Sequence, residues 1–305
     1  MRFLRGKISE RIQQRPAGLP QDSAGLSHDG LIAPPIGPWG ERKYLLVRNY
    51  AQIFANSMKK KWDCRVYIDL FAGAGRSKIE GTSRIVLASP LLALGISDKF
   101  DLYIFCEKDE TKMDALKQRV RINYSDVKVE FIPGDSNSQV NQIISKIPQA
   151  RQAFKILAFC FADPYNLKSL HFATVEALSD RFVDFLILIP SGMDAARNLD
   201  IHYLNPKNKT IDNFLGTPEW RNEWQKVSIG QRFDEFLTNY YGGNMKKLGY
   251  HYPGIESTQL IRSDEKNLPL YRLALFSRAK LGENFWKETK RYSDPQLTFH
   301  FGCEG

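Results

Sequence analysis

The sequence predicts an α/β protein built on a doubly wound, mainly parallel sheet. Short apolar runs alternate along the chain with segments whose apolar residues recur at helical spacing, as strands alternating with helices do. Several runs are apolar at nearly every position, which is typical of strands buried on both faces. With 305 residues, 43% of them hydrophobic and 25% charged, the chain is long enough for one such domain with a sizeable insertion.

The expected strands are runs rich in aliphatic and aromatic residues, most of them separated by a helical segment. In chain order they cover residues 65–70, 102–106, 127–132, 156–161, 182–189, 268–277 and 296–301. The last two are separated by a helix, and we expect them to form an antiparallel edge of the sheet.

Helices are expected where apolar residues share one face. The first covers residues 39–57. Ser89 begins another, with a hydroxyl that can cap it and Pro90 at the first helical position. Asp109 is expected to cap a third helix. Further helices are expected at 140–147, 173–178, 232–240 and 283–291.

Composition divides the chain into three parts. Residues 1–38 begin with a basic stretch and continue with many prolines and glycines, so we expect an extended basic lead-in. Residues 39–190 and 266–305 carry the alternating pattern of the sheet domain. Residues 191–265 break this pattern, and we expect them to form an insertion or lid after the fifth strand.

Charge and metal-binding residue types narrow the classes of function. The net charge of +9 favours polyanionic partners such as nucleic acid. Neither the histidines nor the cysteines have the spacing of a metal site, so no metal is expected. The cysteines fit reduced, buried thiols in a cytoplasmic protein, and no apolar run is long enough to span a membrane.

The stretch YIDLFAGAG, residues 67–75, is the strongest local signal. Asp69 closes an apolar strand, and Gly73 and Gly75 follow at once. In a doubly wound sheet the crevice at the carboxyl ends of the strands binds the ligand. Glycines there let the backbone turn tightly and let a ligand approach its N–H groups. A plain tight turn would have the same sequence. The residues at the neighbouring strand ends are therefore needed to distinguish a binding loop from a turn.

Three further strand ends carry polar residues. Glu107 ends the second strand, where an acid can accept both hydroxyls of a ribose. Asp135 follows the third, where it can reach an adenine amine, although alone it is better explained as a turn residue. Asp163 follows the fourth. Because the four ends meet at one edge of the sheet, a nucleoside-type ligand is favoured.

The loop chemistry favours S-adenosylmethionine (SAM) over NAD or ATP. The glycine pattern departs from the dinucleotide fingerprint, and no phosphate-binding GKS or GKT follows. A carboxylate at Asp69 would attract an ammonium or sulfonium group but repel a pyrophosphate.

These residues resemble class I SAM-dependent methyltransferases, and more closely the three-Cys-motif partner protein family (TcmP). The similar stretches run from about residue 38 to 301. They are KYLLVRNY, YIDLFAGAG, IEGTSRIVLASPLLAL, IFCEKD, FIPGD, FADPYNL, FLGTPEW, LYRLALFSR and ENFWK. DLFAGAG occurs in many methyltransferases, whereas EGTSRIVLASP, DPYNL and FLGTPEW together are more specific.

The resemblance implies a Rossmann-like, seven-stranded methyltransferase sheet, SAM as cofactor, and a partner bearing a three-cysteine motif of radical-SAM type. It implies a SAM pocket formed by Asp69, Phe71, Gly73, Gly75, Glu107 and Asp135. It also makes Asp163, Pro164 and Tyr165 the candidate catalytic edge. It does not fix the substrate.

Asp163-Pro164-Tyr165 is similar to the motif of methyltransferases that act on amines of nucleic acid bases. There the acid and a carbonyl orient the amine, and the aromatic ring stacks on a flipped base. One proline of that motif is missing here. The structural alternative is an Asp163 that caps the next turn and a Tyr165 in the core. Cys160 precedes this site inside the strand and is expected to be inert core.

Two more regions have a functional and a structural interpretation. The basic loop 76–86 could steer a phosphate or be a solvated hairpin. Aromatic and cationic residues of the insertion could bind nucleic acid or a protein, or form the insertion core. These are Trp220, Trp224, Tyr240, Tyr241, Arg221, Lys226 and Arg232. In both regions the structural interpretation is favoured.

Two functions therefore remain open. The first is an enzyme that methylates an amine or other nucleophile, with nucleic acid as a candidate substrate and Asp163 positioning the nucleophile. The second is a non-catalytic subunit that binds SAM or a related nucleoside, or serves as the scaffold of the three-cysteine partner. The incomplete motif at Asp163 favours the second, and the pocket residues from Asp69 to Glu107 favour the first.

Overall fold

The computed structural model describes residues 29–192, 199, 203–227, 230, 232–263 and 267–293. Its main sheet has seven strands in the order β6-β5-β2-β7-β8-β10-β9. The strands are β2 (Cys64–Asp69), β5 (Leu102–Glu107), β6 (Val129–Pro133), β7 (Ile156–Ala162), β8 (Val183–Ile189), β9 (Gln259–Arg262) and β10 (Pro269–Phe276). β6, β5, β2, β7 and β8 are parallel, and β10 is antiparallel to both β8 and β9.

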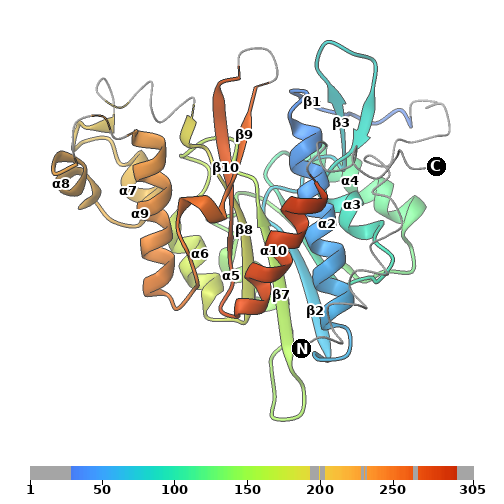
Figure 1. The fold of residues 1–305 in the computed structure, drawn as a ribbon. Coiled ribbons are helices and arrows are strands. Elements are labelled where there is room, and N and C mark those ends of the chain that lie inside the picture. Colours follow the sequence, from blue (N-terminus) through green and yellow to red (C-terminus); the bar gives the residue numbers. More distant parts are fainter. Residues whose placement is uncertain are drawn as a thin grey trace, which may run out of the picture.

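Helices cover both faces of this sheet. Beside α2 (Gly40–Met58), the first face carries α3 (Ser89–Leu94), α4 (Glu110–Asn123) and α10 (Lys280–Tyr292). The other carries α5 (Val140–Lys146), α6 (Phe172–Ser179), α7 (Thr210–Leu215), α8 (Trp220–Gln225) and α9 (Phe233–Lys247). In Figure 1, α2 and α10 lie side by side across the sheet. The predicted doubly wound, seven-stranded fold is confirmed.

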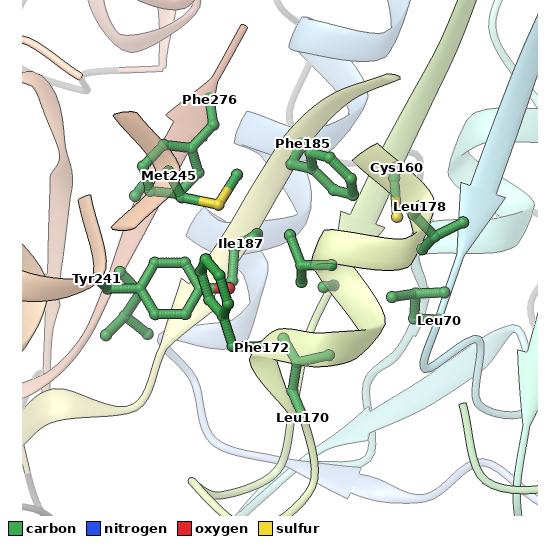
Figure 2. Close-up of a cluster of buried hydrophobic side chains, with 14 of the residues drawn as sticks. Leu70, Cys160, Leu170, Phe172, Leu178, Phe185, Ile187, Tyr241, Met245 and Phe276 are labelled. Atoms are coloured by element: carbon green, nitrogen blue, oxygen red, sulfur yellow. The ribbon is translucent and has the colours of Figure 1, made fainter. Parts of the chain in front are cut away.

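Alternating side chains of the strands supply the two cores. Within β2, Val66 and Ile68 face the α5–α6 side, whereas Tyr67 faces the α2–α10 side. Figure 2 shows that Tyr241 and Met245 of α9 pack near Phe172 of α6 and Phe276 of β10. The helices that follow β8 therefore share one core with the sheet.

The edge strand differs from the prediction. The residues 296–301 lie outside the described part of the chain. The strand that pairs with β10 is β9, which lies within the range 191–265 predicted as an insertion. With only four residues and a single fully buried side chain, Ile261, β9 lacks a strong apolar run. A short 3-10 turn, η3 (Ile255–Ser257), precedes it.

A second, smaller sheet covers the start of the domain. It joins β1 (Pro35–Ile36), β3 (Arg76–Ile79) and β4 (Ile85–Leu87). β1 is parallel to β3, and β3 and β4 form an antiparallel hairpin (Figure 1). The end of the predicted lead-in is thus paired with the hairpin, and the basic loop 76–86 is that hairpin.

The helix starts show one correct and one incorrect prediction. Asp109 caps α4, since its carboxylate accepts the N–H of Lys112 at 3.1 Å. Ser89 does not cap α3: Ala88 occupies the cap position and the helix start has no side-chain cap. The Ser89 hydroxyl instead bonds Asp69, because the strand end places a buried carboxylate beside it.

Candidate functional site

The carboxyl ends of β2, β5, β6 and β7 meet at one edge of the sheet, because these strands are parallel and adjacent. Glu107 is the last residue of β5, and Gly73, Asp135 and Asp163 lie in the loops that follow β2, β6 and β7. The structure therefore gathers the predicted site residues at one edge, although each plays a distinct part there.

Gly73 and Gly75 have different roles in the glycine loop. Both have positive φ angles, +64° and +82°, which other residues adopt only at a cost. A Cβ atom on Gly75 would lie 3.0 Å from side-chain atoms of Leu116 and Leu91, whereas one on Gly73 would meet nothing within 4 Å. Gly75 thus permits close packing on α3 and α4. Gly73 faces open space that a ligand can enter.

Glu107 is bound to the glycine loop. Its carboxylate accepts the N–H of Gly73 at 2.8 Å through one oxygen and the N–H of Asp109 at 2.8 Å through the other. The side chain is half-buried, and each carboxylate oxygen can accept a further hydrogen bond. Glu107 therefore both fixes the loop and retains acceptor capacity for hydroxyl groups.

Asp69 lies beneath this loop and is fully buried. It accepts the N–H of Phe71 at 3.2 Å and hydroxyl bonds from Tyr67 and Ser89. The pKa of Asp69 is raised to about 7, mainly by burial and also by the charges of Asp163 and Glu107, although the bonds from Ser89 and Phe71 lower it. Because no part of Asp69 is exposed, its carboxylate is not available for direct contact at this edge.

Phe71 and Asp135 flank the glycine loop in different ways. The Phe71 ring is half-buried and packs on the core of the α5–α6 side. Asp135 accepts the backbone and side-chain N–H groups of Asn137, both at 3.0 Å, and lies 3.5 Å from Lys108 Nζ. The first of these bonds is the self-contained turn expected of Asp135 as a turn residue.

Asn137 joins two loops of the edge and was not singled out in the sequence. Its side chain donates to the carbonyl of Ser169 and accepts from the N–H of His171 and the hydroxyl of Thr174, at 2.7–2.9 Å. These bonds tie the loop after β6 to the loop after β7. No sequence signal could identify this role, because the partners are more than thirty residues away.

Asp163 forms an ion pair that the sequence analysis missed. Lys43 Nζ, from the first turn of α2, lies 2.5 Å from Asp163 Oδ2, and the two side chains are only 11% and 17% exposed. The rings of Tyr44 and Tyr271 lie 4.9 and 5.9 Å from the ammonium group. Burial lowers the pKa of Lys43, but the charge of Asp163 and both tyrosines raise it by more, so Lys43 stays charged.

Asp163 and Tyr165 do not fit the structural alternative. Among the described residues, the Asp163 carboxylate bonds Lys43 of α2 rather than the next turn. Tyr165 is 93% exposed, so it is not a core residue. Pro164 between them is buried. The strand end thus presents a fixed carboxylate beside a freely accessible aromatic ring.

The insertion aromatics form core, as the favoured interpretation predicted. Trp220 and Tyr241 are fully buried, and the Trp220 indole N–H donates to Asp212 at 2.9 Å. Arg221 bonds the same carboxylate and backbone carbonyls, and Arg232 pairs with Asp234. Trp224 and Tyr240 are half-buried and pack against the same core, so the rings of this region serve packing.

The remaining candidates are also structural. In the β3–β4 hairpin, Arg76 pairs with Asp29 and Arg84 with Glu41. Cys160 is buried, and burial raises the pKa of its thiol well above the ordinary value, as expected of an inert core thiol. Within the described ranges no cluster of side chains could hold a metal ion, and no helix is long and apolar enough to cross a membrane.

No protein-family model matches this chain, and no curated protein sequence matches it. Solved structures with a distantly similar fold include an O-methyltransferase from Bacillus cereus in complex with SAH (11% identity, 89% of this chain and 97% of the other covered, TM-score 0.46). Protein LPL1258 from Legionella pneumophila is similar at 10% identity, with 84% and 94% covered and a TM-score of 0.45. TYW2 from M. jannaschii in complex with AdoMet is similar at 12% identity, with 86% and 82% covered and a TM-score of 0.36.

These likenesses are distant and concern the fold alone. The topology leads to the same class independently, since a central β2, parallel neighbours on both sides and an antiparallel β9–β10 edge are typical of the class I methyltransferase fold. The chain therefore has a methyltransferase-like fold. A shared fold does not by itself carry a substrate or an activity.

Proposed function

We propose that this chain is a SAM-binding, methyltransferase-like protein of the three-Cys-motif partner family. One observation carries the proposal: Gly73, at the carboxyl end of β2, has a left-handed backbone and faces open space, with Glu107 bound to its N–H. A loop of this kind lets a nucleoside ligand approach the backbone while the acid retains capacity for ribose hydroxyls. The residues present fit SAM at this position.

As an enzyme, the protein would methylate an amine, with a base of nucleic acid as the candidate substrate. Bound SAM supplies an electrophilic methyl group. Asp163 Oδ1, the oxygen opposite the Lys43 contact, would accept an N–H of the amine and orient its lone pair. Pro164 would hold the turn, and the exposed ring of Tyr165 would stack on a flipped base.

The Lys43–Asp163 ion pair decides what Asp163 can do during methyl transfer. In this step the amine nitrogen would bond the methyl carbon supplied by SAM in exchange for the carbon–sulfur bond, and the amine proton would leave to solvent. Because Lys43 neutralises Asp163, the carboxylate serves as an acceptor that positions the amine rather than as the final base. A buried counter-charge also limits repulsion among Asp163, Asp69 and Glu107.

The alternative is a non-catalytic subunit that binds SAM or a related nucleoside and serves a three-cysteine-motif protein of radical-SAM type. The motif at Asp163 lacks one proline, and the carboxylate is already committed to Lys43. Both features favour a non-catalytic role for residues 163–165. The two functions share the pocket and differ at residues 163–165.

The first test is calorimetric titration of the purified protein with SAM and SAH, beside Gly73→Arg. The variant should lose binding, because an arginine would fill the open space. Gly81→Arg is the matched control: Gly81 has a φ of +73° and open space around it, but lies at the tip of the β3–β4 hairpin. Absence of binding by the folded wild type would refute the proposal, as would equal loss in both variants.

The second test separates enzyme from scaffold by transfer of labelled methyl groups to single-stranded DNA and RNA. Asp163→Ala is a poor probe, because it would leave the Lys43 cation buried without its partner. Lys43→Met/Asp163→Asn removes both charges together, and Tyr165→Ala changes an exposed ring. Transfer lost in both variants while SAM still binds supports the enzyme; no transfer by a SAM-binding wild type supports the subunit.

A further inference from the structure

The segment 29–36, which ends in β1, is bound to α4 and the hairpin by a buried guanidinium. Arg119 of α4 is 2% exposed at its side chain, and it donates to Asp29 through Nε at 2.8 Å and Nη2 at 3.0 Å. Arg76 Nη1 lies 3.2 Å from the same carboxylate. Asp29 thus neutralises cations from two elements that are distant in sequence.

The same guanidinium reaches the glycine loop. Arg119 Nη1 donates to the carbonyl of Ala74 at 2.5 Å and to that of Ile32 at 2.9 Å. Ala74 lies between Gly73, whose N–H is bound to Glu107, and Gly75, whose carbonyl accepts the N–H of Ala88 at 2.8 Å. The Arg119 bond therefore restrains the peptide group between Ala74 and Gly75, in the middle of the glycine loop.

Backbone pairing holds the segment in place beside the loop. β1 is parallel to β3 (Figure 1), with Lys78 N–H bonded to Pro34 O at 3.0 Å and Glu80 N–H to Ile36 O at 2.9 Å. β3 begins directly after Gly75. The segment 29–36 is thus attached to the glycine loop at two points, through the hairpin that continues it and through Arg119.

We propose that Asp29 and Arg119 are positioning residues of the glycine loop, and that the segment 29–36 holds this loop in its ligand-binding conformation. A buried guanidinium needs a counter-charge to stay in place, and Asp29 supplies it. Without that charge Arg119 would turn toward water and release the Ala74 carbonyl. The link to SAM affinity rests on the proposed function, but the effect on the loop does not.

The experiment compares Asp29→Asn with Glu41→Gln. The two carboxylates each accept two bonds from one arginine, and their side chains are 28% and 27% exposed; Asp29 in addition pairs with Arg76. Glu41 pairs with Arg84 and contacts the hairpin without reaching Ala74. The first measurement is amide hydrogen exchange of the free protein in peptides covering residues 29–36, 70–76 and 280–292.

We expect the rate of amide exchange in residues 70–76 to rise about tenfold in Asp29→Asn. A tenfold rise corresponds to about 1.4 kcal/mol, the size of one charge-assisted hydrogen bond. Glu41→Gln should change it less than about twofold. A rise confined to residues 29–36 and 70–76 supports the proposal. No rise there, or an equal rise in α10, overturns it, because the second result would mean general destabilisation.

Calorimetry with SAM then tests the link to binding. Asp29→Asn should weaken SAM about tenfold, and Glu41→Gln should leave its affinity unchanged. If the wild type binds SAM but both variants bind equally well, the positioning role is refuted. If the wild type does not bind SAM, the proposed function fails while hydrogen exchange still decides whether Asp29 and Arg119 hold the loop.

Discussion

At the carboxyl edge of the sheet, Tyr165 stands 93% exposed beside Asp163, whereas Trp220 among the helices after β8 is fully buried beside Asp212. Both aromatics lie near an acid and a cation: Lys43 pairs with Asp163, and Arg221 with Asp212. Among the helices after β8 all of these groups are buried or nearly so. At the edge only the charged pair Lys43 and Asp163 is largely buried, and the ring of Tyr165 is exposed to solvent.

This difference distinguishes side chains that stabilise the fold from side chains that remain accessible to a ligand. Around Asp212 the indole N–H of Trp220 and the guanidinium of Arg221 both donate to one carboxylate oxygen, beside the packed rings of Trp220 and Phe233. At the edge the Lys43–Asp163 pair fixes a carboxylate just after β7, two residues before the exposed ring of Tyr165. An accessible aromatic next to a fixed acceptor suits recognition, whereas a buried aromatic suits stability.

Trp220→Ala should have the largest effect on stability. Loss of a fully buried indole and its hydrogen bond to Asp212 should lower the free energy of unfolding by about 3–5 kcal/mol, measured by urea denaturation. Trp220→Phe keeps most of the ring volume and should cost less. A loss below about 1 kcal/mol for Trp220→Ala would contradict a core role for the insertion aromatics.

The two buried acids Asp69 and Asp212 should give pH dependences of opposite sign. Burial raises the pKa of Asp69 to about 7 from 3.8, so between these values the folded state binds more protons than the unfolded state. Stability from this group is therefore lost as pH rises from about 4 to about 7, by up to about 1.4 kcal/mol per pH unit. Asp69→Asn should flatten this decline in urea titrations at pH 4–8.

Asp212 provides the contrast. Burial alone would raise its pKa, but bonds from Trp220, Arg221 and Lys209 together lower it below the ordinary value of 3.8. Its contribution is present above that value and is lost as pH falls below it. Asp212→Asn should therefore destabilise the protein at pH 7 and differ less from wild type below pH 4. Parallel pH profiles for the two variants would show that the assignment is wrong.

Breaking the edge ion pair should cost less than removing Trp220. Lys43→Met leaves the Asp163 carboxylate largely buried and unpaired, and Asp163→Asn leaves the ammonium; each should cost about 2 kcal/mol, because both groups retain some exposure. The double variant should cost less than the sum. A double-mutant cycle by urea denaturation measures the coupling, and a coupling near zero would contradict the pair.

Tyr165→Ala should have the smallest effect on stability, within about 0.5 kcal/mol, since the ring is exposed. If the ring stacks on bases, the variant should weaken binding of a labelled single-stranded oligonucleotide by about tenfold, within the range known for one stacked base. Phe182→Ala is the matched control, because Phe182 is 59% exposed but precedes β8 at the opposite edge. Equal effects of the two variants would argue against a stacking role.

Sequence patterns alone determined the alternation of strands and helices, the burial of both sheet faces and the glycine loop after β2. These features are local: an apolar run such as Val183–Ile189 needs two covering layers, and a residue with positive φ at a strand end favours glycine. The same patterns identified Asp109 as a cap and Cys160 as core. They also identified every strand of the main sheet among the described residues except β9.

Only the tertiary structure decided which charges meet. Lys43 and Asp163 are 120 residues apart, and Arg119 and Asp29 are 90 apart, so no spacing rule could join them. Ser89 has the sequence of a helix cap but bonds Asp69, because packing places that carboxylate closer. β9 is too short for a clear pattern and becomes a strand through its pairing with β10. Periodicity encodes which side chains are buried, whereas partners across the fold depend on how the elements pack.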